Sequence, residues 1–441
     1  MRRIRYALLG LAVATALGGA ARASDLLEVY NQAKGYDSQY AAAQAALAAG
    51  KEKYPQGLAG LLPNIAGSVN TFWNRAENVS VTPNNLFTFN SNGWTVQLTQ
   101  PLFRWQNWEA YKQGELQVVQ AEATFGAAAQ DLIVRVAQAY FDVLEAEDNL
   151  AFVKANKAAI AEQLAQAKRN FEVGTATITD TNEAQARYDL AAAQEIAAIN
   201  DLEVKKRALQ LLIGDVPPVL APLRPTLQLE EPKPNNMDAW VTRAQDENFQ
   251  VRAQQAAVEI AKREVGRQRA GHFPTIDLVG NVSANTNQQL ALFAPRQRIE
   301  QTQIGVQLNL PIFSGGAVLS RTREAVALSD KAVSDLDSVR RSAVLDARSS
   351  FLNVSNGLAQ VKALEQALVS SETSLQSNRV GYEVGVRINL DVLNAVQQVF
   401  STKRDLAKAR YDTIINGFKL KQAAGNLTED DIQRANGLLA H

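Results

Sequence analysis

The sequence predicts a mainly α-helical protein with a β-barrel part, built as a tandem duplication of one unit. Three observations support this prediction. The two halves of the chain align at a nearly constant offset, and long alanine-rich stretches without proline fill most of each half. Each half also contains two short segments in which apolar and polar residues alternate, as they do in a half-buried strand. We therefore expect long paired helices together with four strands per chain.

The duplication spans most of the chain. Asp37–Ile65 aligns without gaps with Asn248–Ile276, an offset of 211 residues, and Gly174 meets Gly385 at the same offset. Two copies are too few to form a solenoid array, so we expect the two repeats to pack side by side.

The repeat sets the predicted domain boundaries. The first structural repeat covers 24–214 and the second covers 238–425, followed by a short C-terminal tail at 426–441. Between the repeats, 215–237 is rich in proline, which cannot continue a helix. We expect this connector to cross the outside of the long helices as an equatorial region.

Residues 1–23 have the features of a secretory signal peptide. Arginines near the start precede a short apolar stretch that begins at Tyr6, and Ala21 and Ala23 supply the small residues of a cleavage site. The alternative is a buried N-terminal helix. The order of these features favours a signal peptide, with a mature chain that starts near Ser24 and lies outside the cytoplasm.

Composition excludes several classes of function. The chain has 45 basic and 45 acidic residues, and loss of the four arginines in residues 1–23 would leave a net charge of about −4, which does not favour nucleic acid. Without cysteine, the fold depends on packing rather than disulfides. His272 and His441 are the only histidines, and no glycine-rich phosphate loop follows a strand, so we expect no enzyme, no metal site and no cofactor.

Four segments have the two-residue period of strands that separate an apolar from a polar face. Polar loops, Asn74–Ser91 and Thr286–Glu300, join them in pairs and are expected to face outside. An ordinary soluble hairpin with one buried face is the alternative. The predicted strands are about 61–73, 92–103, 273–286 and 302–313.

No apolar stretch after the predicted signal peptide is long enough for a transmembrane helix, so a membrane crossing would require a closed barrel. Four strands cannot close a barrel, because about eight is the smallest size. Several copies would have to share one barrel, and the pattern alone does not choose between two, three and four copies. Large aromatic residues near the predicted strand ends would form an interfacial girdle: Trp73, Trp94, Phe103, Trp105 and Trp108.

Prolines mark the four predicted joints between helices and strands. Pro63 and Pro274 stand where a helical pattern gives way to a strand, and Pro101 and Pro311 stand where a strand gives way to a helix.

Two stretches free of proline, Arg104–Val173 and Ser314–Val384, predict the long helices. About seventy helical residues at about 1.5 Å each form a rod of roughly 100 Å. In the second stretch, small and apolar residues follow the spacing of a coiled-coil seam. These are Val354, Gly357, Val361, Leu364, Leu368, Ser371 and Leu375.

Taken together, the residues resemble the TolC family of outer-membrane efflux ducts over essentially the whole mature chain. The resemblance rests on the duplicated halves, the proline-containing joints LPNI/FPTI and QPLF/LPIF, and the paired motifs FEVGTATITD and YEVGVRINLDVL, which begin at Phe171 and Tyr382. It implies a homotrimer in the bacterial outer membrane, with a twelve-stranded barrel above a long periplasmic helical tunnel. It also implies a periplasmic adaptor and an inner-membrane transporter of the ABC, RND or MFS type, for drug efflux or type I protein secretion.

The two tip motifs supply the candidate site. Gly174 and Gly385 follow long helices, where glycine adopts a left-handed cap without strain, so each predicts a helical hairpin tip. The resemblance implies that the tips contact the adaptor. The candidate contact residues are Val173, Gly174, Thr175, Val384, Gly385 and Val386.

Polar residues beyond each tip match family positions that hold the tunnel entrance shut: Thr179, Asp180, Tyr382 and Arg387. A charge-assisted bond between Asp180 and Arg387, within or between protomers, is chemically reasonable as a latch. The alternative is that Asp180, with Glu183 three residues later, is the N-cap of a helix.

Asp391 matches the aspartate that rings the narrow entrance in the family, where three carboxylates would favour cations over anions. One turn later the family often has a second aspartate, and this chain has Asn394, which should weaken cation affinity. A solvated helix charge is the alternative for Asp391.

The competing hypothesis is a periplasmic adaptor or structural protein built from coiled coils. Such adaptors usually pair one helical hairpin with compact β modules, whereas this chain has two related units. Several cargoes stay open at this point: drugs, a toxin, a protease or metal ions.

Overall fold

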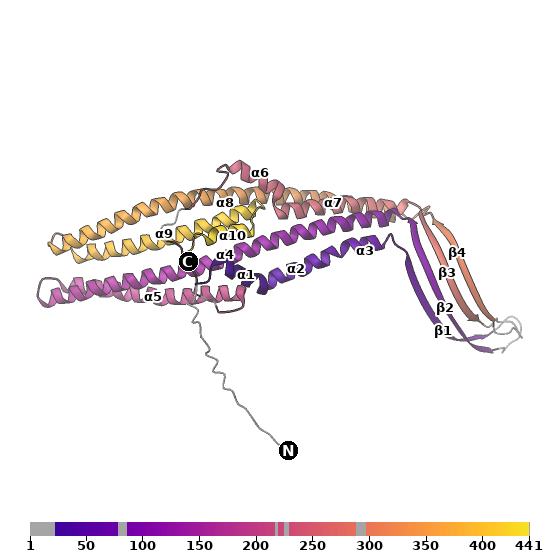
Figure 1. The fold of residues 1–441 in the computed structure, drawn as a ribbon, viewed down its shortest axis with the longest axis horizontal. Coiled ribbons are helices and arrows are strands. Elements are labelled where there is room, and N and C mark those ends of the chain that lie inside the picture. Colours follow the sequence, from indigo (N-terminus) through magenta and orange to yellow (C-terminus); the bar gives the residue numbers. More distant parts are fainter. Residues whose placement is uncertain (1–22, 78–85, 217–218, 225–228, 288–296, 441) are drawn as a thin grey trace, which may run out of the picture.

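The computed structural model describes residues 23–77, 86–216, 219–224, 229–287 and 297–440. Nearly all of the predicted signal peptide, residues 1–22, lies outside these ranges. The described chain forms a long thin molecule with helices along most of its length and a sheet at one end (Figure 1). Within the described ranges, no helix contains an apolar stretch sufficient to span a membrane.

Each half of the chain has the same order of elements: shorter helices, two strands, then two long helices. The first half contains α1 (Leu26–Tyr36), α2 (Ser38–Lys51), α3 (Lys53–Ala59), β1 (Asn64–Glu77), β2 (Leu86–Phe103), α4 (Trp105–Glu172) and α5 (Ile178–Ile213). The second half contains α6 (Met237–Glu247), α7 (Phe249–Arg269), the short 3-10 helix η1 (Ala270–His272), β3 (Thr275–Asn287), β4 (Gln297–Asn309), α8 (Ala317–Glu383), α9 (Asn389–Ala423) and α10 (Glu429–Asn436).

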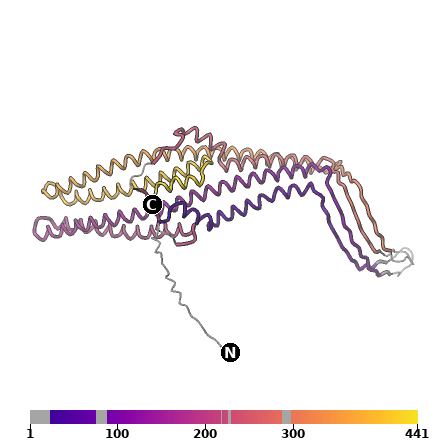
Figure 2. Tube along the Cα trace, in the orientation of Figure 1, coloured from indigo at the N-terminus to yellow at the C-terminus, as the bar shows by residue number. Residues whose placement is uncertain are grey.

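The two predicted long helices are confirmed. Helix α4 contains 68 residues and α8 contains 67, and at about 1.5 Å per residue each is a rod of roughly 100 Å. The trace in Figure 2 shows α4 paired with α5, and α8 paired with α9, over the half of the molecule that lies away from the sheet.

The seam predicted on α8 faces α9. Val354 and Val361 are buried, and a Cβ added to Gly357 would lie 2.5 Å from the hydroxyl oxygen of Thr413 on α9. Because a Cβ cannot approach another atom so closely, a glycine is required here for the two helices to keep their spacing.

The four strands form one antiparallel sheet in the order β1-β2-β3-β4. Several of the expected strand boundaries are wrong. β1 continues to Glu77 and β2 begins at Leu86, so most of the polar segment assigned to a loop is paired strand. β4 ends at Asn309, short of the expected end at 313. Polar residues can extend an antiparallel ladder because the backbone makes its bonds, so alternation underestimates the length of β1 and β2.

The aromatic residues are exposed, but they do not all stand at strand ends. Trp94 lies inside β2 opposite Val69, and Trp105 and Trp108 belong to the first turn of α4. Trp73 is 85% exposed in this single chain. These exposed aromatic residues therefore extend from the sheet onto the start of α4.

The joints between sheet and helices lie at or near the four prolines. Pro63 and Pro274 directly precede β1 and β3, Pro311 follows the end of β4, and the pairing of β2 with β3 shifts register beside Pro101. At this level Arg104 donates two hydrogen bonds to the carboxylate of Asp277, of 2.7 and 2.6 Å. This bidentate pair connects the start of α4 to β3.

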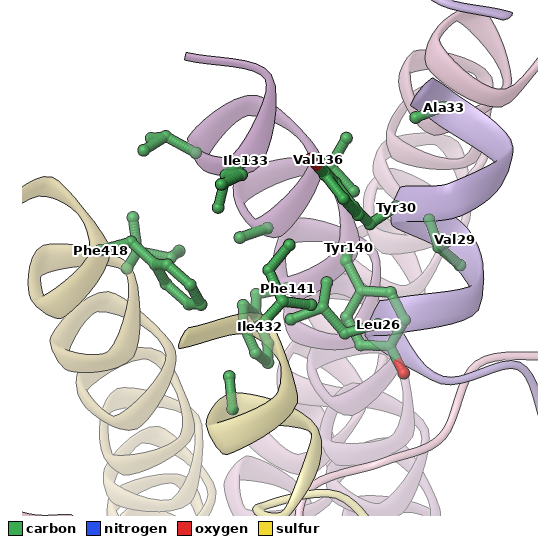
Figure 3. Close-up of a cluster of buried hydrophobic side chains, with 14 of the residues drawn as sticks. Leu26, Val29, Tyr30, Ala33, Ile133, Val136, Tyr140, Phe141, Phe418 and Ile432 are labelled. Carbon is green, nitrogen blue, oxygen red and sulfur yellow. The ribbon is translucent and has the colours of Figure 1, made fainter. Parts of the chain in front are cut away.

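The largest apolar core lies at mid-length, where α1, α4, α9 and α10 meet (Figure 3). Tyr140 and Phe141 are fully buried there, and the Tyr140 hydroxyl donates to the carbonyls of Ser24 and Ala221. The connector pairs with both ends of the described chain, through Ser24 with Leu220 and Leu223 with Leu439. The described parts of the connector are thus held against residues near both ends of the described chain.

Candidate functional site

The two hairpin tips lie at the same end of the molecule, away from the sheet (Figure 1). One tip joins α4 to α5 and the other joins α8 to α9. The candidate site is the surface of these tips together with the first turns of α5 and α9.

Both tips turn by the same hydrogen-bonded motif. Gly174 and Gly385 have φ values of +77° and +79°, the left-handed conformation that ends a helix. In the first tip Thr175 N donates to the Asn170 carbonyl at 2.8 Å, and in the second Val386 N donates to the Gly381 carbonyl at 2.9 Å. These bonds close the last helical turn, so each chain reversal is a defined cap.

The apolar residues of the tips point into solvent. Val173, Val384 and Val386 are 72%, 66% and 76% exposed. Since the backbone of both tips is fixed by the caps, these valines form two small apolar surfaces that a partner can cover at little cost in chain entropy.

Asp180 takes part in a capping box at the start of α5, but the N-cap is not the one expected. The cap residue is Thr177, whose hydroxyl accepts from Asp180 N at 3.3 Å, and the Asp180 carboxylate accepts from Thr177 N at 3.0 Å. Asp180 is thus the third residue of the helix rather than its cap. A carboxylate here also complements the positive end of the helix dipole.

The other gate candidates make separate contacts within the chain. The Tyr382 hydroxyl accepts from Asn170 Nδ2 at 3.0 Å, and Arg387 lies 3.7 Å from the carboxylate of Asp391, one turn away. Thr179 is exposed in the first turn of α5. Within one protomer, therefore, Asp180 is engaged by the cap and Arg387 by Asp391.

The structure adds three residues that the sequence did not indicate. Asn170 connects α4 to α8 through Tyr382, and Arg187 connects α5 to α9 through Asn394, at 3.0 Å. Gly381 is buried, and a Cβ there would lie 2.7 Å from Cγ of Arg387, so glycine leaves room for the arginine stem. The repeat offset of 211 residues aligns Asn170 with Gly381, so these two residues occupy equivalent positions in the two hairpins.

No group of metal-ligating side chains is present in the described ranges. The candidate site consists of hydrogen-bonding side chains and exposed valines at one end of the paired helices. Among the candidate site residues there is no arrangement of a nucleophile with a general acid and base.

Solved structures share this fold. The channel CusC superposes with a TM-score of 0.79 at 18% identity, covering 92% of each chain. The outer-membrane protein VceC of Vibrio cholerae has a TM-score of 0.77 at 19% identity and covers 91% of this chain and 96% of its own. The long paired helices and the four-stranded sheet thus belong to a fold that known outer-membrane channels share, and the expected fold class is confirmed.

The sequence relatives identify the family. The outer membrane efflux protein family matches residues 7–215 and 240–426, on either side of the proline-rich connector. Outer membrane protein TolC of Vibrio cholerae is 33% identical and covers 97% of this chain and 98% of its own length. The alkaline protease secretion protein AprF of Pseudomonas aeruginosa is also 33% identical, covering 98% and 91%. The chain belongs to the outer membrane efflux protein family.

Family membership decides between the two hypotheses drawn from the sequence. The protein is an exit duct in the bacterial outer membrane and is neither a periplasmic adaptor nor an enzyme. Membership of this family, which includes efflux and secretion channels, implies a trimeric channel that works with an adaptor and an inner-membrane transporter.

Proposed function

We propose that the tips form a closable periplasmic entrance to the duct, which opens when an adaptor and a transporter dock. The observation that carries this proposal is the position of both tips at one end, each with a fixed cap, exposed valines and polar residues just beyond (Figure 1).

The exposed valines and their glycines are the proposed adaptor contacts. Helical caps present a rigid apolar surface, and the adaptor would bury it without first ordering a loop. These residues are Val173, Gly174, Thr175, Val384, Gly385 and Val386. The transporter is of the ABC, RND or MFS type, and the cargo is a small molecule or a secreted polypeptide.

The gate residues are Thr179, Asp180, Tyr382, Arg387, Asp391 and Asn394. Within the chain, Asp180 and Arg387 each have another partner. The latch bond between them is therefore proposed across neighbouring protomers, where threefold repetition multiplies a contact that is worth only about 0–1 kcal/mol when exposed.

The test is single-channel conductance of the purified trimer in planar lipid bilayers. Asp180→Ala combined with Arg387→Ala should raise the conductance, because the entrance loses its latch. The matched control is Asp405→Ala combined with Arg404→Ala, which removes an acid and a base that pair with each other on α9.

A second variant separates the latch from the cap. Thr177→Ala removes the N-cap hydroxyl but keeps the Asp180 carboxylate, so it should leave the conductance near that of the parent. If the double variant conducts like the parent, the latch is removed from the proposal. If Thr177→Ala raises the conductance as much as the double variant does, Asp180 acts through the helix cap.

A further inference from the structure

One arginine joins the two helical hairpins near their tips. Arg187 on α5 donates from Nη1 to the Gln397 side-chain oxygen at 2.5 Å and from Nη2 to the Asn394 side-chain oxygen at 3.0 Å. Both acceptors belong to α9. α5 is part of the first repeat and α9 of the second, so this contact crosses between the repeats.

We propose that Arg187 is the residue that holds α9 against α5 in the closed state of this duct. The inference rests on the proposed gate and assigns it a closing contact that lies within one protomer. Asn394 then has a specific role, because its amide oxygen is an acceptor for this arginine.

The geometry suits an arginine in particular. Asn394 and Gln397 are three residues apart on a helix, so their side chains lie on one face. The guanidinium is a planar fork that can donate to two acceptors at once, whereas a lysine ammonium is a single point on a flexible stem. The nearest carboxylate, that of Glu183 on α5 itself, is 4.0 Å away. The amides of α9 are therefore the closer partners.

Few other side-chain bonds connect the hairpins at this end. Within the described ranges, the two bonds of Arg187 are the side-chain hydrogen bonds that join α5 to α9. Asn170 and Tyr382 make the corresponding link between α4 and α8. The next links lie farther from the tips, where Lys408 and Tyr411 of α9 bind Glu145 and Asp148 of α4.

Two side chains in the first turns of α5 and α9 have buried polar atoms without a hydrogen-bond partner among the described residues. Asn389, the first residue of α9, is 3% exposed, and neither polar atom of its amide has a partner within the described part of this single chain. The same holds for the buried hydroxyl of Thr181, in the first turn of α5. One turn further along, Leu393 and Ala184 share an apolar cluster.

Buried polar atoms without partners disfavour the arrangement that buries them. Under this proposal, opening of the two hairpins at this end lets water reach the polar atoms of Asn389 and Thr181. The closed arrangement therefore depends on contacts that offset this cost, and Arg187 supplies two of them.

The experiment compares Arg187→Ala with the parent as full-length trimers in planar bilayers. Removal of two hydrogen bonds from a charged donor should shift the ratio of closed to open entrances by about tenfold per protomer. The expected readout is a higher mean conductance, with unchanged resistance of the trimer to dissociation by heat. Arg207→Ala is the matched control, because Arg207 is an arginine of α5 whose partners among the described residues, Glu203 and Gln210, belong to its own helix.

Changes of the acceptors distinguish a closing contact from a general defect. Asn394→Ala combined with Gln397→Ala should open the channel like Arg187→Ala, and all three changes together should add nothing more. Asn394→Asp should keep the entrance closed, because the carboxylate accepts from Arg187 as an ion pair.

Three results would overturn the inference: Arg187→Ala conducting like the parent, Arg207→Ala having the same effect, or Asn394→Asp opening the channel. In each case the parent still forms channels, so the proposed function survives. If the parent itself forms no channels, the proposed function is wrong.

Discussion

Asp37 should be a larger source of stability than its place between two short helices suggests. Its carboxylate accepts from Arg135 of α4 through both oxygens, at 2.9 and 3.0 Å, and from Tyr40 N at 2.7 Å. It is 5% exposed. The residue therefore caps α2 and fixes that helix to α4 at the mid-length core.

The magnitude can be worked from these contacts. An N-cap is worth about 1 kcal/mol, and breaking a buried ion pair costs about 3–5 kcal/mol. Arg135 is partly exposed and keeps a second partner, Asp131, at 2.7 Å, which reduces the cost. We expect Asp37→Asn, which keeps a cap oxygen, to lose about 2 kcal/mol and Asp37→Ala to lose about 3 kcal/mol.

The assay is guanidinium unfolding of the purified trimer, followed by helical circular dichroism. Asp131→Ala is the control, because this exposed pair partner one turn from Arg135 should contribute only about 0.3–0.5 kcal/mol. If Asp37→Asn costs no more than Asp131→Ala, the pair with Arg135 does not stabilise the core.

The pH dependence gives an independent check. The hydrogen bonds from Arg135 hold the pKa of Asp37 below its usual range. A depressed pKa in the folded state adds stability that is present above the unfolded pKa, near 4, and is lost as the pH falls through the folded value. The difference between the parent and Asp37→Asn should therefore shrink on acidification below about pH 4. A constant difference would contradict this assignment.

Two further predictions concern other carboxylates. Asp391→Ala should reduce the preference for cations, seen as a reversal potential closer to zero in a salt gradient, and an unaltered potential would mean that Asp391 does not line the constriction. Burial raises the pKa of Asp148, although the hydroxyl of Tyr411 donates to it at 2.7 Å. Its ionised form thus opposes folding at neutral pH, and Asp148→Asn should unfold at an equal or higher guanidinium concentration than the parent at pH 7, an advantage that disappears near pH 4. A clear loss of stability at pH 7 would show that the charge is needed.

Much of the fold follows from local patterns that have a strong physical cause. Gly174 and Gly385 mark the tips because few other residues adopt a left-handed cap cheaply, and Pro63 and Pro274 mark the joints because proline ends a helix. The long helices follow from the absence of proline over about seventy positions. These features depend on the residues near each position and little on contacts between distant parts of the chain.

The strand ends and the site contacts were harder to predict. The extension of β1 to Glu77 is made by backbone pairing across polar residues, which no side-chain alternation signals. The sequence offers Asp180 as an alternative N-cap because aspartate suits that position as threonine does, and only the geometry of the turn places the cap at Thr177. Arg187 could not be assigned because its partners are 207 and 210 residues away in the sequence.

The pairing of the connector with residues near both ends of the described chain has a practical consequence for labelling the protein. Ser24 pairs with Leu220, and Leu439 pairs with Leu223, so both ends of the described chain meet at the same level of the rods. A fluorophore or affinity handle attached near Leu439 would lie at this level, away from the hairpin tips and from the sheet (Figure 1). Such a handle would hold the protein on a surface while the hairpin tips and the sheet stay accessible.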